Sequence, residues 1–414
     1  MSESKTDIVV TGLGVTSSIG QGKAEFTSAL FSAAANFRVM QRPGRQFPST
    51  DDALKTQFIG AEIDKLTLSD RIPAGLVRTA SFSGQAALAC LDEAWDDANL
   101  LDVDPTRIGL VVGGSNFQQR ELVQIHDSYR EKLAFLRPTY GLSFMDSDVC
   151  GMCTDVFGIR GVAYTIGGAS ASGQVAVLKA IQAVESGQVD VCIAIGALMD
   201  LSYWECQGFR ALGAMGSERY ASTPELACRP FDKARDGFIY GENCAAIVVE
   251  KATSANRPNI SAYARVAGWS MRMDANRNPD PSFDGEVAVI QEALKKACIS
   301  PSEVDYINPH GTGSGLGDET ELKAITHCGL KKAYINSTKS IIGHGLTAAG
   351  AVEIAATLIQ MRENKLHICR NLDDPMDTSF NWVRQEPLHT ELNTALKMSM
   401  GFGGTNSALC LQAI

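Results

Sequence analysis

Short runs of apolar, β-branched residues alternate along the chain with longer stretches in which apolar residues recur every three or four positions. The short runs predict buried strands, and the longer stretches predict helices with one apolar face. Such helices are predicted at Arg78–Asp97 and Ser172–Glu185, while the turn formers in Met40–Gln57 predict a loop that crosses the surface. Strands are predicted at "DIVVTG" (from Asp7), "RIGLVVGG" (Arg107), "VAYTIGG" (Val162), "VDVCIAIGA" (Val189) and "CAAIVVEK" (Cys244). The alternation indicates an α/β fold.

The second half of the chain repeats this pattern after a polar, proline-containing join at residues 252–259. The segments "AYTIGGASASGQVAVLKAIQ", from Ala163, and "AYINSTKSIIGHGLTAAGAVEIAATLIQ", from Ala333, each read as a strand, a Gly/Ser-rich turn and an Ala-rich helix. We therefore predict two similar halves, residues 1–251 and 252–414. Further strands are predicted near Ile260 and at "VDYINPHG" (Val304), "AYINSTKS" (Ala333) and "ALKMSMGFGG" (Ala395).

Composition narrows the class of protein. The 414 residues are 45% hydrophobic and 20% charged, which is ordinary for a soluble chain with a large core. A net charge of -10 argues against nucleic-acid binding, which needs a concentrated positive surface. The longest apolar run, Val191–Met199, is far shorter than the roughly 20 residues of a spanning helix. The first residues, "MSESKTDIVVTGLG", lack the pattern of a targeting signal, so we expect a cytoplasmic protein without a membrane segment.

Neither the cysteines nor the glycine-rich stretches indicate a bound cofactor. The 11 cysteines are scattered, which predicts reduced and mostly buried thiols. Cys150 and Cys153 form one C-x-x-C, but no second pair or thioredoxin-like context accompanies them. No phosphate-binding loop or dinucleotide fingerprint occurs, so we expect chemistry without a metal or a nucleotide.

Two of the six histidines follow predicted strands in glycine-rich settings: His310 in "NPHGTGSGLGD" and His344 in "NSTKSIIGHGLTAAGAVE". Functional sites of α/β proteins lie where strands end, and glycine lets a ligand approach closely, so both histidines are candidates for catalysis. Lys339, in the same turn as His344, could bind a ligand or hold a neighbouring acid. The other four histidines are interpreted as surface or packing residues: His126, His327, His367 and His389.

Three further features carry candidate chemistry. Ser170, in "GGASASG", lies where a predicted helix begins, a position that stabilises developing negative charge; a simple capping role for Ser170 or Ser172 is the alternative. Asp318 and Glu321 follow His310 at helical spacing, either as supports for the site or as a charged first turn. Phe402 lies in a glycine-rich turn, "GFGGTN", that could face a ligand or serve folding alone.

Three of these motifs occur in order after a fourth one, and the four together resemble the β-ketoacyl-acyl-carrier-protein synthases, the ketosynthases. The motifs are "RPFDKARDGFIYGEN" (Arg229), "NPHGTGSGLGD" (Asn308), "NSTKSIIGHGLTAAGAVE" (Asn336) and "GFGGTN" (Gly401), and the resemblance begins at "DIVVTGLGVTSSIG" (Asp7). It implies a duplicated thiolase-like α/β fold in five layers, α-β-α-β-α, and a homodimer. It also implies acyl groups delivered on the phosphopantetheine arm of an acyl carrier protein, with Thr312 and Ser314 lining the pantetheine channel.

The resemblance places a cysteine nucleophile where this chain has Ser170. The pKa of a cysteine thiol is about 8.5 and is lowered further at a helix start, whereas a serine needs an adjacent base. Condensation is therefore in doubt, but decarboxylation of a malonyl thioester belongs to the matching His310 and His344, whose N–H groups would stabilise the enolate oxygen. Phe402 would pack against the departing carboxylate.

The function predicted from the resemblance is decarboxylation of malonyl-acyl carrier protein to acetyl-acyl carrier protein. Ketosynthase-like chains with this Cys-to-Ser change occur in polyketide pathways, where the acetyl group feeds a hydroxymethylglutaryl-synthase-like partner that installs a β-branch. Two alternatives stay open. Ser170 could itself carry an acyl group with a histidine as base, or the chain could be a non-catalytic partner subunit like the chain-length factors.

Overall fold

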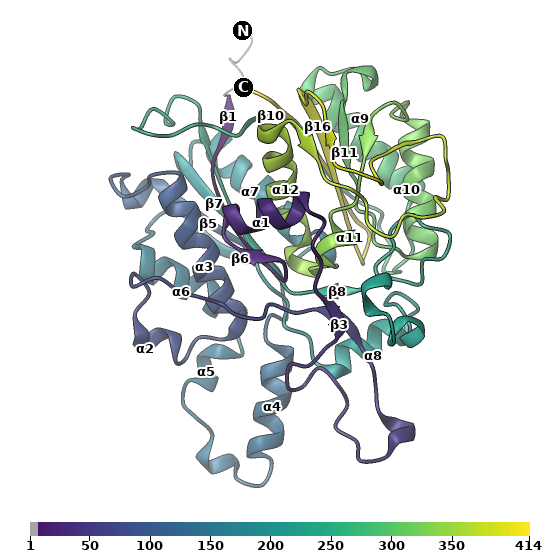
Figure 1. Ribbon diagram of the computed structural model, residues 1–414. Helices are drawn as coiled ribbons and strands as arrows, with labels where there is room; N and C mark the ends of the chain where they lie inside the picture. The colour runs from purple at the N-terminus through teal and green to yellow at the C-terminus, as the bar shows by residue number, and fades with distance from the viewer. Residues whose placement is uncertain (1–6) are drawn as a thin grey trace.

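Two segments of β-sheet with the same strand order form the framework of the computed structural model, which describes residues 7–414 (Figure 1). The N-terminal segment runs β6-β5-β7-β9-β1 and the C-terminal segment β12-β11-β16-β17-β10. In both, the first three strands are parallel and the last two pairings are antiparallel. β1 also pairs with β10 through Val9–Arg265 and Val10–Ala264, so the segments join in one hydrogen-bonded sheet. The α/β class is confirmed, while the residue that divides the halves stays a prediction.

Each predicted run contains a strand, although the strand expected near Ile260 begins at Ala264. The strand over residues 405–412 and several short strands were not predicted. In the first half they are β1 (Ile8–Ser17), β2 (Gly20–Gln21), β3 (Phe37–Val39), β4 (Ile59–Ala61), β5 (Ile108–Gly113), β6 (Ala163–Ile166), β7 (Val191–Gly196), β8 (Tyr240–Gly241) and β9 (Asn243–Lys251). In the second half they are β10 (Ala264–Met273), β11 (Tyr306–Asn308), β12 (Tyr334–Ile335), β13 (Lys365–Leu366), β14 (Asn381–Trp382), β15 (Leu388–His389), β16 (Thr394–Gly401) and β17 (Thr405–Gln412).

The helices were predicted less evenly. α7 has the predicted bounds, but α3 begins four residues after Arg78, because Ser81 accepts a hydrogen bond from Gly84 N and starts the helix there. The helices are α1 (Lys23–Phe31), α2 (Ala74–Val77), α3 (Phe82–Asp97), α4 (Gln119–Tyr129), α5 (Tyr140–Ser143), α6 (Ser147–Phe157), α7 (Ser172–Glu185), α8 (Tyr203–Ala211), α9 (Phe283–Ala297), α10 (Gly315–His327), α11 (Lys339–Ile342) and α12 (Ala349–Glu363).

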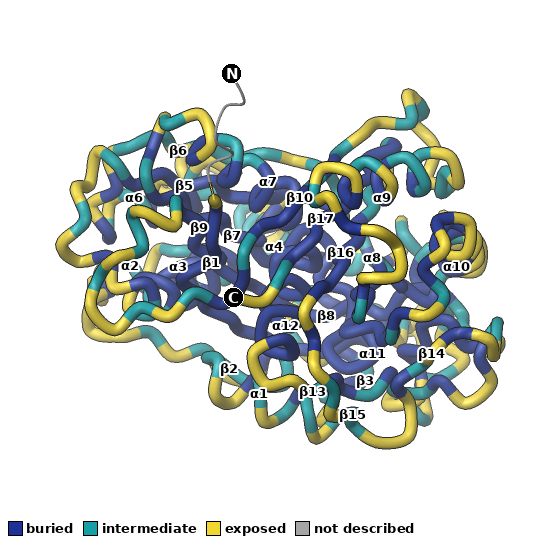
Figure 2. Tube along the Cα trace, turned by 90° about the horizontal axis from the view of Figure 1, so that it is seen from above, coloured by how far each residue is buried: buried dark blue, intermediate teal, exposed yellow. Residues whose placement is uncertain are grey.

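The core is divided by the sheet into layers. α7 and α12 lie between the two segments and are buried almost throughout, as Figure 2 shows. α3 and α6 cover the outer face of the N-terminal segment, and α9 and α10 cover that of the C-terminal segment (Figure 1). This is the predicted order of five layers, α-β-α-β-α.

Glycines let the two central helices approach at their first turns. A Cβ on Gly173 of α7 would lie 2.7 Å from the backbone nitrogen of Ala351, and one on Gly350 of α12 would lie 2.6 Å from that of Gln174. Either contact is too short for any side chain, so both positions need glycine for backbone contact. The contact brings together the turns that precede α7 and α12, which carry the candidate residues Ser170 and His344.

Several other expectations fall on described residues. The loop Met40–Gln57 does not simply cross the surface, because Arg45 within it is completely buried. Cys150 and Cys153 lie in α6 as free thiols, and burial raises the pKa of Cys150 to about 11. Within residues 7–414, every helix is too short or too polar to cross a membrane. The expectation that the chain starts without a targeting signal falls partly on residues 1–6, outside the described residues.

Candidate active site

A cavity of about 200 Å³ opens where the two halves meet, and nearly all of the predicted site residues line it. Ser170 reaches it from the first half, and His310, His344 and Phe402 reach it from the second. Thr312 and Ser314 of the predicted pantetheine channel, and Asp318 and Glu321, complete the predicted set along its wall. Lys339 is the exception, because it lies behind His310 and outside the lining.

The turn before α7 presents Ser170 to this cavity. Ser172 fixes the turn: its hydroxyl donates to the carbonyl oxygen of Ala169 (2.7 Å) and accepts from Gly168 N (2.9 Å). Ala169 takes a left-handed conformation (φ 48°), which is uncommon for alanine and directs the chain sharply into the helix. Among residues 7–414 the Ser170 side chain has no hydrogen-bond partner, so neither histidine is bonded to it as a base. The capping role left open for Ser170 is not observed, and Ser172 stabilises the turn instead.

His344 is held in one orientation and one tautomer. Its backbone pairs with the segment around β8, donating to Ile239 O (2.7 Å) and accepting from Gly241 N (3.1 Å). Its Nδ1 accepts a hydrogen bond from Leu346 N (3.2 Å), so in the neutral ring the proton is on Nε2. The ring of Phe238 lies edge-on at 5.2 Å between centroids and packs against the imidazole. His344 therefore has a fixed Nε2–H donor.

His310 lies against His344 at the same cavity. Their ring centroids are 5.5 Å apart and the planes are nearly perpendicular, at 84°. Nδ1 of His310 is buried and has no hydrogen-bond partner among residues 7–414. Burial lowers the pKa of both histidines well below the ordinary value, and the nearby charges of Lys339 and Lys397 lower it further. Both imidazoles are neutral at pH 7, and each offers one N–H.

The backbone of His310 is anchored by a chain of buried charges. Lys339 donates to the carbonyl oxygen of His310 and to Glu353 of α12, and Lys397 of β16 contacts the other Glu353 oxygen at 2.8 Å. All three side chains are at most 1% exposed. Lys339 is therefore placed to position His310 rather than to touch a ligand.

Asp318 and Glu321 hold the loop that follows His310. Glu321 accepts hydrogen bonds from His310 N (2.5 Å) and Gly311 N (2.8 Å), and Asp318 accepts from Phe231 N, Thr312 N and Gly313 N at 2.6–3.1 Å. Burial raises the pKa of Asp318 to about 6 and that of Glu321 to about 7, although these bonds oppose it. These contacts indicate that Asp318 and Glu321 support the loop of the site and are not simply charged residues in the first turn of a helix.

Phe402 lies on the turn between β16 and β17, against the turn of Ser170. A Cβ on Gly401 would lie 2.2 Å from the carbonyl oxygen of Gly168, so glycine is required where the turns meet. The Phe402 side chain is 38% exposed and lies 6.4 Å from the ring of Phe209 in α8. An aromatic ring thus stands half-exposed at the cavity, beside the serine.

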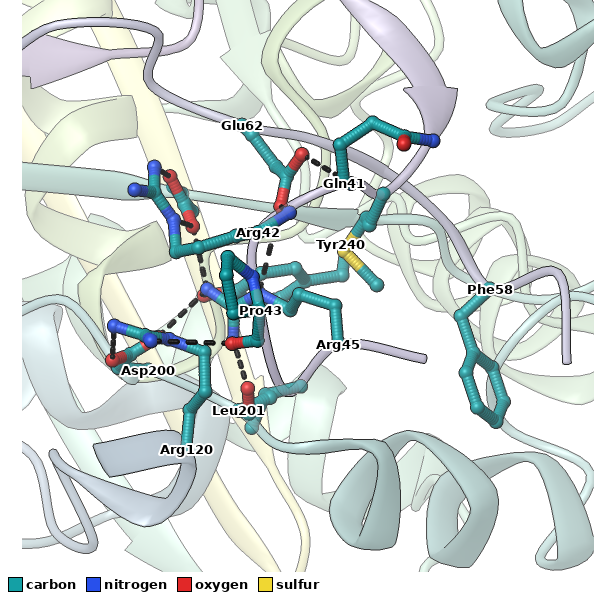
Figure 3. Close-up of polar contacts among 12 residues, drawn as sticks. Gln41, Arg42, Pro43, Arg45, Phe58, Glu62, Arg120, Asp200, Leu201 and Tyr240 are labelled. Atoms are coloured by element: carbon teal, nitrogen blue, oxygen red, sulfur yellow. Dashed lines mark hydrogen bonds and ion pairs between the residues drawn. The ribbon is translucent and has the colours of Figure 1, made fainter. Parts of the chain in front are cut away.

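Figure 3 shows a network of arginines and acids in which Arg42, Arg45 and Arg120 lie close to Asp200 and Tyr240. Arg45 bonds Glu242 (2.5 Å) and Asp200 (2.7 Å), and its guanidinium lies 5.0 Å from the centre of the Tyr240 ring. Arg42 pairs with Glu242, and Arg120 with Asp200. Burial opposes ionisation of Glu242, but the arginines prevail and lower its pKa. Loop 40–57 is thereby fixed to β8, whose backbone pairs with His344.

Sequence reasoning missed several residues at or behind the cavity. Glu286 lines the cavity from α9, and its spacing from the buried Val289, Ile290 and Ala293 places a carboxylate on the apolar face of that helix. That irregularity was visible in the sequence. Lys397 had no such signal, because β16 is buried on both faces and shows no alternation.

Comparison with known proteins gives the family context. The chain matches the family models "Beta-ketoacyl synthase, N-terminal domain" over residues 5–255 and "Beta-ketoacyl synthase, C-terminal domain" over residues 263–373. It is 58% identical to the polyketide biosynthesis malonyl-ACP decarboxylase PksF of Bacillus subtilis (strain 168), covering 99% of this chain and 97% of that protein. It is 29% identical to the 3-oxoacyl-(acyl-carrier-protein) synthase 2 of Coxiella burnetii, covering 99% of each chain.

Solved structures give the same picture of the fold. The ishigamide ketosynthase/chain length factor superimposes with a TM-score of 0.88 at 24% identity, over 99% of this chain and all of that chain. A ketosynthase from a type II complex with its acyl-carrier protein superimposes with a TM-score of 0.84 at 26% identity, over the same shares.

Proposed function

The chain belongs to the β-ketoacyl synthase family, and from that premise we propose that it decarboxylates malonyl-acyl carrier protein to acetyl-acyl carrier protein. One observation carries the proposal: two neutral histidines share a cavity in which the residue at the helix start is a serine without a base. The 58% identity to the decarboxylase PksF supports the same reaction.

The cavity offers what loss of carbon dioxide requires. When the carboxylate leaves, negative charge moves onto the thioester oxygen, and fixed donors aimed at that oxygen lower the barrier. His344 supplies the Nε2–H and His310 supplies a second N–H. Each neutral ring donates its N–H in a hydrogen bond and does not transfer the proton. Phe402 offers an apolar surface for the departing carboxylate.

Storage of an acyl group on Ser170 lacks the same support. A serine hydroxyl becomes nucleophilic when an adjacent base takes its proton, and no such hydrogen bond reaches Ser170 within the described chain. This site therefore does not support the half-reaction in which the enzyme stores an acyl group as a covalent intermediate.

The partner in this proposal is an acyl carrier protein, whose phosphopantetheine arm brings the malonyl group past Thr312 and Ser314. Both hydroxyls line the cavity, and they hydrogen-bond one another at 3.0 Å. The carrier complex of the related ketosynthase supports this choice of partner. The enzyme would act in the cytoplasm as a homodimer, need no cofactor of its own, and pass acetyl groups to a hydroxymethylglutaryl-synthase-like enzyme of polyketide β-branching.

The decisive experiment follows the mass of the carrier. Purified protein is incubated with malonyl-acyl carrier protein, and we expect the carrier to lose the mass of carbon dioxide. His310→Ala and His344→Ala should each slow this loss by roughly 10²–10³-fold, the usual effect of removing one oxyanion donor. A carrier that keeps its malonyl mass with the unmodified protein contradicts the proposal.

Two alternatives are separated in the same assay. Ser170→Ala should keep appreciable decarboxylation, whereas acyl transfer through Ser170 requires that this variant be inactive. A non-catalytic partner subunit would leave the carrier unchanged and would co-purify with a cysteine-bearing homologue.

A further inference from the structure

Glu286 places a carboxyl group in the cavity wall without a hydrogen-bond partner. The residue lies in the first turns of α9, is 1% exposed, and lines the same cavity as His310 and His344. Its Oε2 is buried and unpartnered among residues 7–414. An unpaired buried carboxylate costs several kcal/mol, on the order of the effective penalty for any buried ion, so the group needs a reason to be there.

The neighbours of Glu286 favour its protonated form. Glu321 and Asp318 face it from α10, and Asp274 faces it from the end of β10. The nearby positive groups interact with other carboxyls. Arg235 lies 4.0 Å from Asp318, and the charge of Lys397 opposes the rise in the pKa of Glu321. Burial first, and then these like charges, raise the pKa of Glu286 well above its ordinary value.

Among the buried titratable groups that line the cavity, Glu286 is the best suited to give up a proton. The histidines are neutral, and a neutral imidazole that loses a proton becomes a strongly basic anion. Asp318 and Glu321 already accept backbone hydrogen bonds, three and two respectively, so their carboxyl oxygens are engaged in holding the loop after His310. Asp274 accepts from the side chain of Asn406 at 2.8 Å.

The reaction proposed above needs such a donor. Loss of carbon dioxide from the malonyl thioester breaks the bond between C2 and the carboxyl carbon and leaves the electron pair in the enolate. A condensing enzyme passes that pair to an acyl carbon, but a decarboxylase must pass it to a proton before an acetyl group exists.

We propose that Glu286 is the general acid that protonates C2 of the enolate. A new C–H bond forms at C2, the O–H bond of Glu286 breaks, the enolate oxygen becomes the thioester carbonyl again, and the Glu286 carboxylate recovers its proton from water. This inference rests on the proposed function and adds a second half to it. The residues around Glu286 do not offer a metal instead, because residues 7–414 hold no group of three or more ligating side chains arranged for one.

The test separates proton delivery from loss of carbon dioxide. Glu286→Gln keeps the shape of the side chain and removes its acidic proton. In ¹³C-labelled bicarbonate, an enolate that waits for a proton recaptures labelled carbon dioxide and returns to labelled malonyl-carrier. We expect acetyl-carrier formation by this variant to fall roughly 10²-fold, the usual contribution of a general acid, while label entering the malonyl group rises relative to acetyl formed.

Two further variants make the result specific. Asp284→Asn removes an exposed carboxylate from the same turn of α9 and should match the unmodified protein. Glu286→Asp restores an acid one methylene shorter and should recover part of the acetyl formation. Unchanged acetyl formation by Glu286→Gln, or equal loss of acetyl formation and of label exchange, contradicts the role of Glu286. If the unmodified protein itself leaves malonyl-carrier intact, the proposed function fails before this inference is reached.

Discussion

At the scale of single residues, the turn around Ser170 has a backbone suited to a reactive nucleophile, although the side chain at that position is a serine. The left-handed Ala169, the Ser172 hydrogen bonds and the start of α7 form a position that stabilises an anion, yet the side chain there is a hydroxyl. The backbone can therefore be tested separately from the side chain it carries.

Ser170→Cys should create a reactive thiol. The helix start lowers the pKa of a cysteine, so iodoacetamide should alkylate position 170 near pH 7 faster than it alkylates Cys298, the exposed native cysteine. Peptide mass spectrometry measures both rates in one sample. Ser172→Cys is the matched control, because Ser172 is completely buried two residues away and should stay unlabelled. Labelling at 170 that is no faster than at Cys298 would show that the turn does not activate an anion.

Glu286 also makes a prediction about stability, independent of catalysis. Its pKa is raised in the folded state above the ordinary value of 4.5, so its stabilising contribution is present at low pH and is lost as the pH rises through the folded value. Glutamine does not titrate. The thermal midpoint of Glu286→Gln relative to the unmodified protein should therefore increase between about pH 5 and pH 8, measured by calorimetry in matched buffers. A difference that stays constant with pH would mean that Glu286 is not held protonated.

At the scale of elements, the alternation of apolar runs was enough to place α7 and most of the main strands, because those elements are built from local periodicity, but β17 was missed. It was not enough for loop 40–57, where turn formers predicted a surface segment. Arg45 is buried there because its partners, Asp200 and Glu242, come from parts of the chain some 150 to 200 residues away. Pairing at that distance leaves no mark in a local pattern.

Replacement of Arg45 by methionine should lower the free energy of unfolding by about 3–5 kcal/mol, because the buried acids Asp200 and Glu242 each lose a partner. Unfolding in urea, followed by circular dichroism, measures the change. Arg130→Met is the control: Arg130 is 72% exposed and pairs with Asp127, which is 52% exposed, so its loss should cost at most about 1 kcal/mol. Similar costs for both variants would show that the Arg45 network does not hold the loop.

Glu353 of α12 pairs with Lys339 of α11 and Lys397 of β16, and we expect substitutions in this cluster to lower the free energy of unfolding by different amounts. Glu353→Gln removes the carboxylate that the buried Lys339 and Lys397 share, whereas Lys397→Met leaves the Lys339–Glu353 pair intact. We expect the glutamine variant to lose about 3–5 kcal/mol of unfolding free energy and the methionine variant clearly less. Urea titrations of both give the order directly, and the reverse order would contradict the pairing described here.

At the scale of the whole molecule, the duplication explains why the site is where it is. The echo between the segments from Ala163 and Ala333 predicted two strand–turn–helix units, and the structure brings their turns together through Gly173 and Gly350. Glu286 and Lys397 were not predicted as site residues, because their roles depend on the side chains that other elements place beside them.

The surface of the whole molecule also bears on the predicted homodimer. β6 is the last strand of the sheet and, in residues 7–414, pairs only with β5, so one edge keeps free backbone groups. The stretch between α4 and α6 exposes large apolar side chains, and its last residue, Asp146, accepts a hydrogen bond from the side chain of Thr165 in β6 (3.4 Å). The most exposed of these side chains are Leu133 (71%), Phe135 (76%), Leu142 (61%) and Phe144 (49%). An open strand edge beside an exposed apolar surface is a site for association with a second chain.

We therefore expect the unmodified protein to sediment at twice its chain mass of 44.3 kDa. Phe135→Glu combined with Phe144→Glu should shift it toward the single-chain mass, because two buried charges would have to be accommodated in the interface. Leu54→Glu, a substitution at a side chain 57% exposed in loop 40–57, should leave the mass unchanged. Sedimentation velocity across a range of concentrations distinguishes these outcomes. A single-chain mass for the unmodified protein would contradict the dimer, and a dimer that survives the paired substitution would place the interface elsewhere.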